Sequence, residues 1–386
     1  DMKNWKAAGP DGIIPEVWKA AIEEGPMKRC VTTLLRKVWN ESHIPEEWGC
    51  AEVVTIHKKG DAECMDNYRG ISLLPVGLKA LCTIAARRLN LHMEENNLLD
   101  RRQAGFRKRE ECLGHVTALL ETVQRRELKK MKSFLGFIDF KKAYDRVPHG
   151  ALLAKLGGET GAREQGRFMQ FVKELYRNPR ITVRTDGRKT DCPLEVGLRQ
   201  GCPMSPALFN VFINDVFSGL GEGDVDNEGT GLAFADDLLI IGGTNEVLRN
   251  AVERVQRWTD TWEMEINPKK CGLLAIGISQ EERATVKMVV QGEEVLAAES
   301  YTYLGIELDE KLSRKKMGKA RKKKGLGILA MLEKSLRRTA IPLEYRALVV
   351  RGIAMPAMKY GAEAYGSTAT ITGEIQKVAN IALKII

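Results

Sequence analysis

Residues 231–241 read Gly-Leu-Ala-Phe-Ala-Asp-Asp-Leu-Leu-Ile-Ile, with an apolar arm on each side of an acidic pair. This pattern is typical of a buried β-hairpin that carries carboxylates at its tip. Burial of Asp236 and Asp237 without a cation would be costly in free energy. The stretch therefore indicates a hairpin whose tip faces a positively charged partner.

A second acidic position follows a short apolar and aromatic run. Residues 133–140 read Ser-Phe-Leu-Gly-Phe-Ile-Asp-Phe, which has the length and composition of a strand. Before it, the apolar residues of 113–130 recur at helical spacing and end in basic residues, as expected of a helix C-terminus. We therefore expect a helix, then a strand that places Asp139 at its end.

Other segments of the chain also predict secondary structure. Residues 168–176 favour a helix, and Asp186-Gly187 between β-favouring runs predicts a hairpin turn. From residue 311 the character changes, because 311–324 contain nine Lys or Arg in fourteen positions. We expect a separate basic helical region there, which contacts nucleic acid or is a solvated charged face or localisation patch.

Composition limits the class of protein. A chain of 386 residues is longer than a single hydrophobic core usually supports, so two or three subdomains are expected. The net charge of +9 fits a polyanionic partner, although many basic proteins have none. The eight cysteines show no Cys-x-x-Cys pair and are expected to be reduced. We expect an intracellular, nuclear protein without a membrane segment, and a piece of a longer chain.

The two acidic strand ends bracket a loop rich in Gly and Pro, residues 197–206. Phosphoryl transfer uses carboxylates on rigid elements to hold two divalent cations, one at the attacking hydroxyl and one at the leaving group. Oxygen ligands favour magnesium or manganese over zinc. The order of these segments therefore predicts a metal-dependent nucleotidyltransferase.

These three segments resemble motifs A, B and C of reverse transcriptases, and most closely those of retrotransposons that lack long terminal repeats. Five flanking segments agree in their order: Gly9-Pro-Asp-Gly-Ile, Asn67-Tyr-Arg-Gly-Ile-Ser-Leu-Leu, Gln103-Ala-Gly-Phe-Arg, Asn267-Pro-Lys-Lys-Cys and Tyr303-Leu-Gly-Ile-Glu-Leu. The resemblance covers nearly the whole chain. It implies an RNA-directed DNA polymerase that binds an RNA template, a DNA or RNA primer, the RNA/DNA hybrid and deoxynucleoside triphosphates.

The resemblance also implies roles for individual residues. Asp139 and Asp236 would be the principal magnesium ligands, with Asp237 as a weaker ligand or orienting group and the carbonyl of Phe140 completing the shell. Asp145 is expected instead to be a helix cap or an ion-pair partner. Tyr144 matches the aromatic residue that lies beneath the incoming sugar, where a ring clashes with a ribose 2′-hydroxyl and so selects deoxynucleotides.

Further residues would bind the nucleotide. Lys58 and Arg69 resemble the finger residues that hold the triphosphate, although Gly70 stands where the family usually has proline and is expected to loosen the finger turn. Gln200 would lie near the incoming nucleotide. Lys270 would approach the leaving phosphate as an acid or electrostatic stabiliser, and the adjacent Lys269 is an alternative.

Five residues are expected to contact or support the nucleic-acid strands: Gln103, Gly105, Gly201, Leu304 and Gly305. For Gln103 and Gly105 an ordinary turn is the alternative. Glycines at 201 and 305 would let a ligand backbone approach closely. The segment Tyr303-Leu304-Gly305 resembles the hairpin that steadies the primer end.

The expected fold class is α/β (α+β), a right-hand polymerase. Residues 1–135 would form the fingers with part of the palm, 136–310 the palm and 311–386 a helical thumb. Two alternatives keep a related fold: a polymerase-like domain that only binds nucleic acid, which would have lost its metal carboxylates, and an RNA-dependent RNA polymerase, against which Tyr144 argues. The sequence leaves open the oligomeric state, the template preference and the presence of an attached endonuclease.

Overall fold

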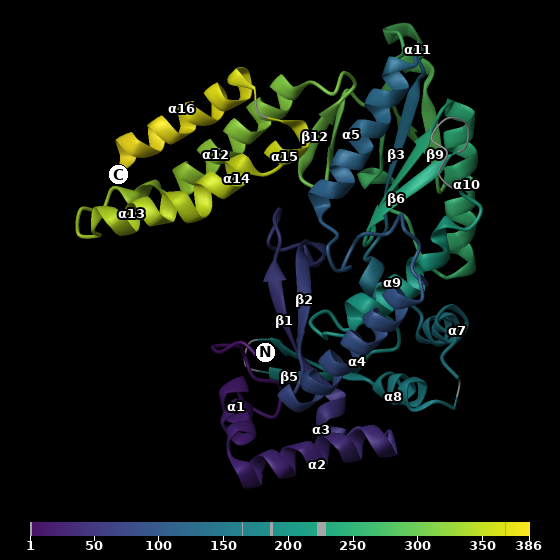
Figure 1. Cartoon of the computed structure of the whole chain (residues 1–386), viewed down its shortest axis with the longest axis vertical. Helices are drawn as coiled ribbons and strands as arrows, with labels where there is room; N and C mark the ends of the chain where they lie inside the picture. The colour runs from purple at the N-terminus through teal and green to yellow at the C-terminus, as the bar shows by residue number, and fades with distance from the viewer. Residues whose placement is uncertain (1, 164, 186–187, 222–228, 367) are drawn as a thin grey trace. The chain divides into compact units, whose positions relative to one another are not determined.

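The computed structural model describes residues 2–163, 165–185, 188–221, 229–366 and 368–386 (Figure 1). Contacts divide the chain into two compact units, each made of three separate stretches. Unit 1 comprises residues 1–107, 140–218 and 257–265, and unit 2 comprises 108–139, 219–256 and 266–386. The three-part division into fingers, palm and thumb has other boundaries and stays a prediction.

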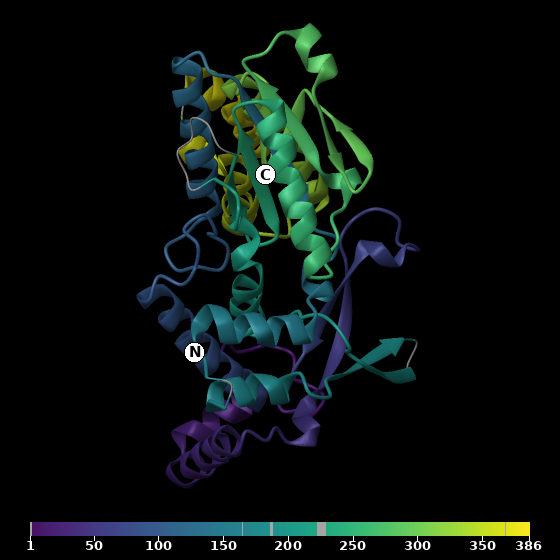
Figure 2. The same cartoon turned by 90° about the vertical axis from the view of Figure 1, so that its right-hand side faces the viewer.

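Unit 1 combines helices with a four-stranded sheet in the order β2-β1-β4-β5. Its helices and strands are α1 (Pro15–Glu23), α2 (Gly25–Glu41), α3 (Glu46–Gly49), β1 (Cys50–His57), η1 (Met65–Asn67), β2 (Tyr68–Leu73), α4 (Val76–Glu95), α6 (Ala143–Arg146), α7 (His149–Thr160), α8 (Arg167–Leu175), β4 (Arg180–Thr185), β5 (Arg188–Pro193), α9 (Ser205–Ile213) and η2 (Asn214–Phe217). Both hairpins, β1–β2 and β4–β5, extend away from the helices of this unit (Figure 2).

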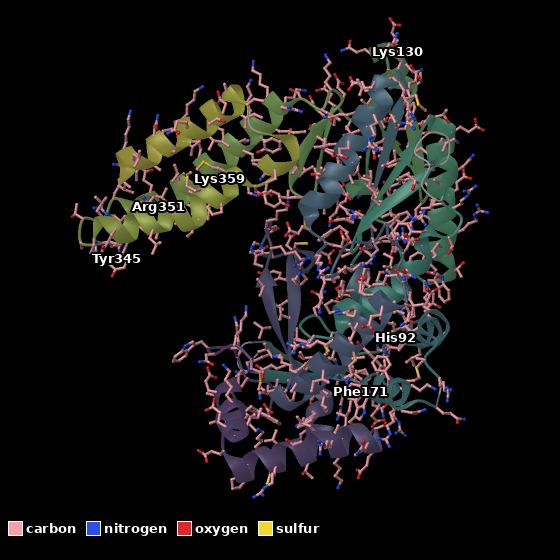
Figure 3. The ribbon with its side chains drawn as sticks, viewed as in Figure 1. His92, Lys130, Phe171, Tyr345, Arg351 and Lys359 are labelled. Carbon is pink, nitrogen blue, oxygen red and sulfur yellow. The ribbon has the colours of Figure 1, made fainter. Side chains whose placement is uncertain are left out.

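Side chains from distant stretches join the helices of unit 1. Phe171 in α8 is fully buried and contacts Trp39 in α2, with ring centroids 5.3 Å apart (Figure 3). The imidazole Nε2 of His92 in α4 lies 3.0 Å from the carbonyl oxygen of Thr160, at the end of α7. These contacts join helices from stretches that lie far apart in the sequence.

The two hairpins of unit 1 test two expectations. Strands β4 and β5 pair antiparallel as predicted, and the Asp186-Gly187 dipeptide itself lies outside the described residues. The expectation that Gly70 loosens the finger turn is wrong. Gly70 lies inside β2 and pairs in regular register with Thr55, whereas the turn spans residues 58–67.

Unit 2 contains a four-stranded antiparallel sheet in the order β6-β7-β3-β8. Its helices and strands are α5 (Cys112–Leu128), β3 (Ser133–Asp139), β6 (Thr230–Phe234), β7 (Asp237–Gly242), α10 (Asn245–Thr261), η3 (Pro268–Lys270), β8 (Gly272–Ile276), α11 (Gln280–Thr285), β9 (Lys287–Val290), β10 (Glu293–Leu296), β11 (Ser300–Tyr303), β12 (Ile306–Asp309), α12 (Arg314–Leu336), α13 (Leu343–Val349), η4 (Val350–Ala354), α14 (Met355–Lys359), α15 (Ala362–Tyr365) and α16 (Ala369–Ile385). The last turn of α10 belongs to unit 1.

Strand β3 is buried along almost its whole length because helices cover both faces of its sheet (Figure 1). The predicted apolar face of α5 packs against one face, through Val116, Leu119, Leu120 and Val123. On the other face α10 comes so close that a Cβ on Gly136 would lie 3.0 Å from a methyl group of Leu248. The helix, the strand and the hairpin predicted for this region are confirmed.

The predicted basic helix is confirmed as α12, and α13, α14 and α16 lie beside it (Figure 1). These helices belong to the same compact unit as the sheet, so a separate basic region stays a prediction. The hydroxyl oxygen of Ser313 caps α12 by accepting a hydrogen bond from the amide of Lys316. Apolar side chains from α12, α14 and α16 form a second core, which includes Leu329, Met358 and Val378. Tyr345, Arg351 and Lys359, labelled in Figure 3, belong to α13, η4 and α14.

Candidate active site

The three carboxylates predicted to bind metal lie together at one end of the unit 2 sheet. Asp139 is the last residue of β3 and pairs directly with Asp237, the first residue of β7. Asp236 lies in the tight turn between β6 and β7, where Ala235 has a φ of 58°. The predicted hairpin with carboxylates at its tip is therefore confirmed, and its register places the tip beside Asp139.

The charges of these carboxylates act on one another. Partial burial, together with the nearby charges of Asp236 and Asp139, raises the pKa of Asp237 to about 6. The residue still keeps an exposed surface. Such mutual repulsion at adjacent strand ends is relieved when a cation binds between the groups.

The donor set fits a hard divalent cation. Carboxylate oxygens are the ligands that magnesium and calcium prefer. Across the described ranges, however, no three His, Cys, Asp or Glu side chains already stand in an arrangement that could hold a metal ion. We therefore infer the fit from the identity of the donors and from their electrostatic coupling.

Lys270 reaches the same carboxylates. The backbone amide of Asn267 donates a 2.8 Å hydrogen bond to the carbonyl of Asp139, which fixes η3 beside the end of β3. The ammonium Nζ of Lys270 then lies 3.9 Å from Oδ1 of Asp139. Lys270, rather than Lys269, is the lysine with this ion pair. Its side chain is 67% exposed, so it is free to reach a ligand.

The predicted primer-contact turn also lies beside Asp237. A cleft of about 180 Å³ is lined by Asp237, Leu304 and Gly305, together with residues of β3 and β11. Leu304 and Gly305 have positive φ angles of 45° and 77°. The hydroxyl of Tyr360 donates a 2.8 Å hydrogen bond to the carbonyl of Leu304, which holds the turn in place.

Sequence reasoning missed Tyr301 in this cleft and named Tyr303 only as the first residue of the primer-contact hairpin. Tyr301 stacks on Phe137 with centroids 4.2 Å apart, and its hydroxyl donates a 2.9 Å hydrogen bond to the carbonyl of Lys270. Burial raises the pKa of Tyr301 to about 12 and also raises that of Tyr303. The Tyr-Thr-Tyr alternation was a usable signal, because residues two apart in a strand share a face.

In unit 1, the aromatic ring of Tyr144 has two aromatic neighbours. It stacks on Phe209, with centroids 4.6 Å apart and planes 13° apart, and Phe106 meets its edge at 6.1 Å. Phe209 is fully buried, so it provides a rigid support for the ring. Phe140, the other predicted residue of this segment, is buried and packs edge-on against Trp258.

The predicted loop of motif B is attached to the segment that carries Tyr144. The carbonyl of Tyr144 accepts a 2.7 Å hydrogen bond from the amide of Leu198. The side-chain amide of Gln200 donates a 2.7 Å hydrogen bond to Oδ1 of Asp145. Asp145 is therefore not the helix cap that the sequence suggested, because Lys142 occupies the N-cap of α6.

Three of the residues predicted to contact nucleic acid are held by contacts within the protein. Gln103 is fully buried, and its side-chain oxygen accepts a 2.8 Å hydrogen bond from the amide of Gly105. The carbonyl of Gly105 in turn accepts a 2.8 Å hydrogen bond from the side-chain amide of Asn210. These contacts favour the ordinary-turn interpretation. At Gly201 the φ of 115° and a Cβ position 2.6 Å from the carbonyl oxygen of Ser72 require glycine for contact between loop and strand.

Lys58 and Arg69 lie at the turn end of the β1–β2 hairpin and are exposed. The backbone amide of Lys58 donates a 2.8 Å hydrogen bond to the carbonyl of Asn67, which closes the base of the turn. A neighbouring ion pair, Lys142 to Asp66 at 2.7 Å, ties the turn to the segment before Tyr144. The proposed roles of both residues stay predictions.

Comparisons with known proteins agree on one family. The family described as "Reverse transcriptase (RNA-dependent DNA polymerase)" matches residues 56–308. The retrovirus-related Pol polyprotein of type-1 retrotransposable element R2 from Nasonia vitripennis is 28% identical over 78% of this chain and 29% of its own length. The RNA-directed DNA polymerase of mobile element jockey from Drosophila melanogaster is 25% identical over 87% of this chain and 37% of its own length.

Solved structures show the fold. Apo telomerase from Candida tropicalis matches with a TM-score of 0.55 and 12% identity, over 97% of this chain and 63% of that one. The same enzyme in complex with a fragment of telomeric RNA matches with a TM-score of 0.51 and 12% identity, over 94% of this chain and 66% of that one. The mixed helix and sheet architecture is thus that of right-hand polymerases. No helix in the described part of the chain is long and apolar enough to span a membrane.

Proposed function

Because the chain belongs to the reverse transcriptase family, we propose that it extends a DNA or RNA primer with deoxynucleotides and copies an RNA template. The relatives named above come from a retrotransposable element and a mobile element, and we propose that this chain comes from a retrotransposon that lacks long terminal repeats. The chain spans only 29% and 37% of the length of these relatives. The activity is therefore proposed for this domain alone, and we propose that it acts in the nucleus.

One observation carries the proposal. Asp139, Asp236 and Asp237 lie together at paired strand ends, where the charges of Asp139 and Asp236 raise the pKa of Asp237. Magnesium ions held by these carboxylates would activate the primer 3′-hydroxyl and neutralise the leaving pyrophosphate. The carbonyl of Phe140 is proposed as a further ligand. Tyr301 and η3 hold Lys270 near Asp139, where its ammonium Nζ can stabilise charge or give a proton to the leaving phosphate.

Other residues are proposed to bind the substrates. Lys58 and Arg69 would grip the triphosphate, Gln200 would lie against the nucleotide, and Tyr144 would exclude ribose. Leu304 and Gly305 would support the primer end, since their turn lines the same cleft as Asp237. Hybrid recognition would rest on backbone and shape more than on base sequence.

Primer extension tests the proposal. The 386-residue chain, with a primed RNA template, deoxynucleotides and magnesium, should extend the primer, and Asp236→Asn should reduce the rate by at least about 100-fold, because a ligand of the phosphoryl-transfer site is lost. Asp260→Asn is the matched control, an exposed aspartate on α10 that should leave the rate unchanged. Equal extension by wild type and Asp236→Asn would overturn the site assignment. No extension by wild type would favour a nucleic-acid-binding scaffold.

A further inference from the structure

Phe106 has a backbone conformation that a phenylalanine disfavours. Its φ of 61° lies in the left-handed region, where a bulky aromatic residue is uncommon and strained. The residue is also 48% exposed, so packing in a hydrophobic core does not explain its position. Such strain persists only where the surrounding structure holds it, and it is frequent at functional sites.

Hydrogen bonds hold the turn that carries Phe106. The amide of Gly105 donates to the side-chain oxygen of Gln103, and the carbonyl of Gly105 accepts from the side-chain amide of Asn210, both at 2.8 Å. Gln103 and Asn210 are themselves buried. The guanidinium of Arg107 donates a 3.0 Å hydrogen bond to the carbonyl of Gln103. The backbone of Phe106 is therefore fixed on both sides.

One helix supports both this turn and the ring of Tyr144. Asn210, which holds the turn, follows Phe209 in α9, and Phe209 stacks on Tyr144 with centroids 4.6 Å apart. The rings of Phe106 and Tyr144 have centroids 6.1 Å apart and planes at 80°, which is an edge-to-face contact. All four residues belong to unit 1. Consecutive residues of one buried helix thus set the positions of both rings.

Two aromatic contacts restrain the ring of Tyr144 more than one does. Phe209 covers one face of this ring, so Phe106 meets the ring on another side. Stacking on Phe209 alone would leave the ring able to shift away from the nucleotide, whereas a second contact limits that movement. A steric clash discriminates against ribose only while the ring stays in place.

We propose that Phe106 is a specificity-determining residue, which positions the ring of Tyr144 and so helps to exclude ribonucleotides. This inference rests on the proposed function, in which Tyr144 selects deoxynucleotides. Phe106 is a positioning residue, because it acts on the sugar only through Tyr144. The need for a ring at this point explains why a phenylalanine occupies a conformation that suits glycine.

Single-nucleotide incorporation on a primed RNA template, with deoxynucleotide and ribonucleotide in separate reactions, tests the role of Phe106. Phe106→Gly removes the ring and suits the positive φ, so the turn should stay folded. We expect this variant to raise kcat/KM for the ribonucleotide about three- to tenfold, within the range of one edge-to-face aromatic contact. Its kcat/KM for the deoxynucleotide should stay unchanged.

Three variants serve as controls. Phe106→Tyr keeps the ring and should keep the selectivity of wild type. Leu91→Ala removes a similarly exposed apolar side chain of α4 and should change neither kcat/KM value. Phe106→Leu lacks the ring but does not have the backbone freedom of glycine. It repeats the comparison if Phe106→Gly fails to fold.

A Tyr144→Ala background separates positioning from other roles. If Phe106 acts through Tyr144, Phe106→Gly should cause no further change in selectivity once the ring of Tyr144 is absent. A purely structural role would instead lower kcat/KM for both substrates equally and leave their ratio unchanged. A further change in the Tyr144→Ala background would mean that Phe106 acts on the nucleotide directly. Either of these two results overturns the inference.

Failure of the proposed function gives a different result. If wild type does not extend primers, or if Tyr144→Ala leaves the selectivity unchanged, the assignment of Tyr144 fails and the role of Phe106 fails with it. If Tyr144→Ala raises ribonucleotide use but Phe106→Gly and Phe106→Leu do not, only the role of Phe106 is overturned.

Discussion

The ring of Tyr144 is held by Phe209 behind it and Phe106 at its edge, so its position depends on aromatic packing. Discrimination by a steric clash needs such rigidity, because a mobile ring would move aside for a 2′-hydroxyl. We therefore expect Tyr144→Ala to raise ribonucleotide incorporation relative to deoxynucleotide incorporation by at least about tenfold.

Single-nucleotide incorporation kinetics with each substrate check this. Tyr144→Phe keeps the ring and the stacking and should keep the selectivity. If Tyr144→Ala discriminates as wild type does, the ring only packs, and the case against an RNA polymerase loses its main support.

The carboxyl of Asp237 predicts a pH dependence. Its pKa of about 6 in the folded chain lies above the ordinary value of 3.8, so the folded state binds more protons and stability falls as pH rises from about 4 to 6. Without metal, Asp237→Asn should therefore raise the melting temperature at pH 7.5, by less than about 3 °C because the group is partly exposed, and change little at pH 4.5.

Thermal melting in EDTA at both pH values measures this, with Asp260→Asn as control. With magnesium at pH 7.5, wild type should melt at a higher temperature than Asp237→Asn, since the wild-type carboxylate then has a positive partner. A variant less stable than wild type at pH 7.5 without metal would show that Asp237 is not held against like charges.

At the scale of elements, α12 divides its basic residues between two uses. Arg321 is buried, donates a hydrogen bond to the carbonyl of Gly305 and lies over the ring of Tyr360, 4.8 Å from its centroid. Lys322 pairs with Glu374 in α16 at 2.7 Å. Lys323 and Lys324 are exposed. The basic run is therefore partly an internal brace for the Leu304–Gly305 turn.

Replacement of Arg321 by Ala should thus cost about 2–4 kcal/mol of stability, because a buried hydrogen bond and its packing are lost. Lys323→Ala, its exposed neighbour, should change stability by less than about 0.5 kcal/mol. Urea unfolding of the two variants compares them. Equal losses of stability in the two variants would mean that Arg321 behaves as one more surface charge.

Sequence patterns could predict the elements whose burial is periodic. The spacing of Val116, Leu119 and Val123 predicted α5, and the run that ends in Asp139 predicted β3 and its acidic end. The use of Arg321 could not be predicted, because adjacent basic residues look alike until a tertiary neighbour selects one of them. Burial of Gln103 and the hydrogen bond from Tyr301 to Lys270 likewise depend on pairings between distant residues.

At the scale of the whole molecule, the net charge of +9 predicts salt-dependent binding to an RNA/DNA hybrid. Each lysine that neutralises a phosphate adds about one unit to the slope of log affinity against log salt. We expect the double variant Lys323→Gln, Lys324→Gln to reduce that slope by about two units, because both side chains are exposed on α12.

Fluorescence anisotropy of hybrid binding, at salt concentrations from about 50 to about 300 mM, measures the slope. The control, Lys28→Gln with Lys37→Gln on α2, removes the same charge from exposed positions of unit 1. If both double variants reduce the slope equally, the effect follows net charge, and α12 has no special contact with the hybrid.

The interleaving of the two units also affects how the chain emerges from the ribosome. Strand β3 ends at residue 139, but its neighbour β8 is made only at residues 272–276. At about 5–20 residues per second, this strand waits roughly 7–30 s for its second partner. An apolar strand with an open edge is prone to pair with other chains during that interval. Faster translation or a chaperone that covers this edge should therefore raise the yield of folded protein.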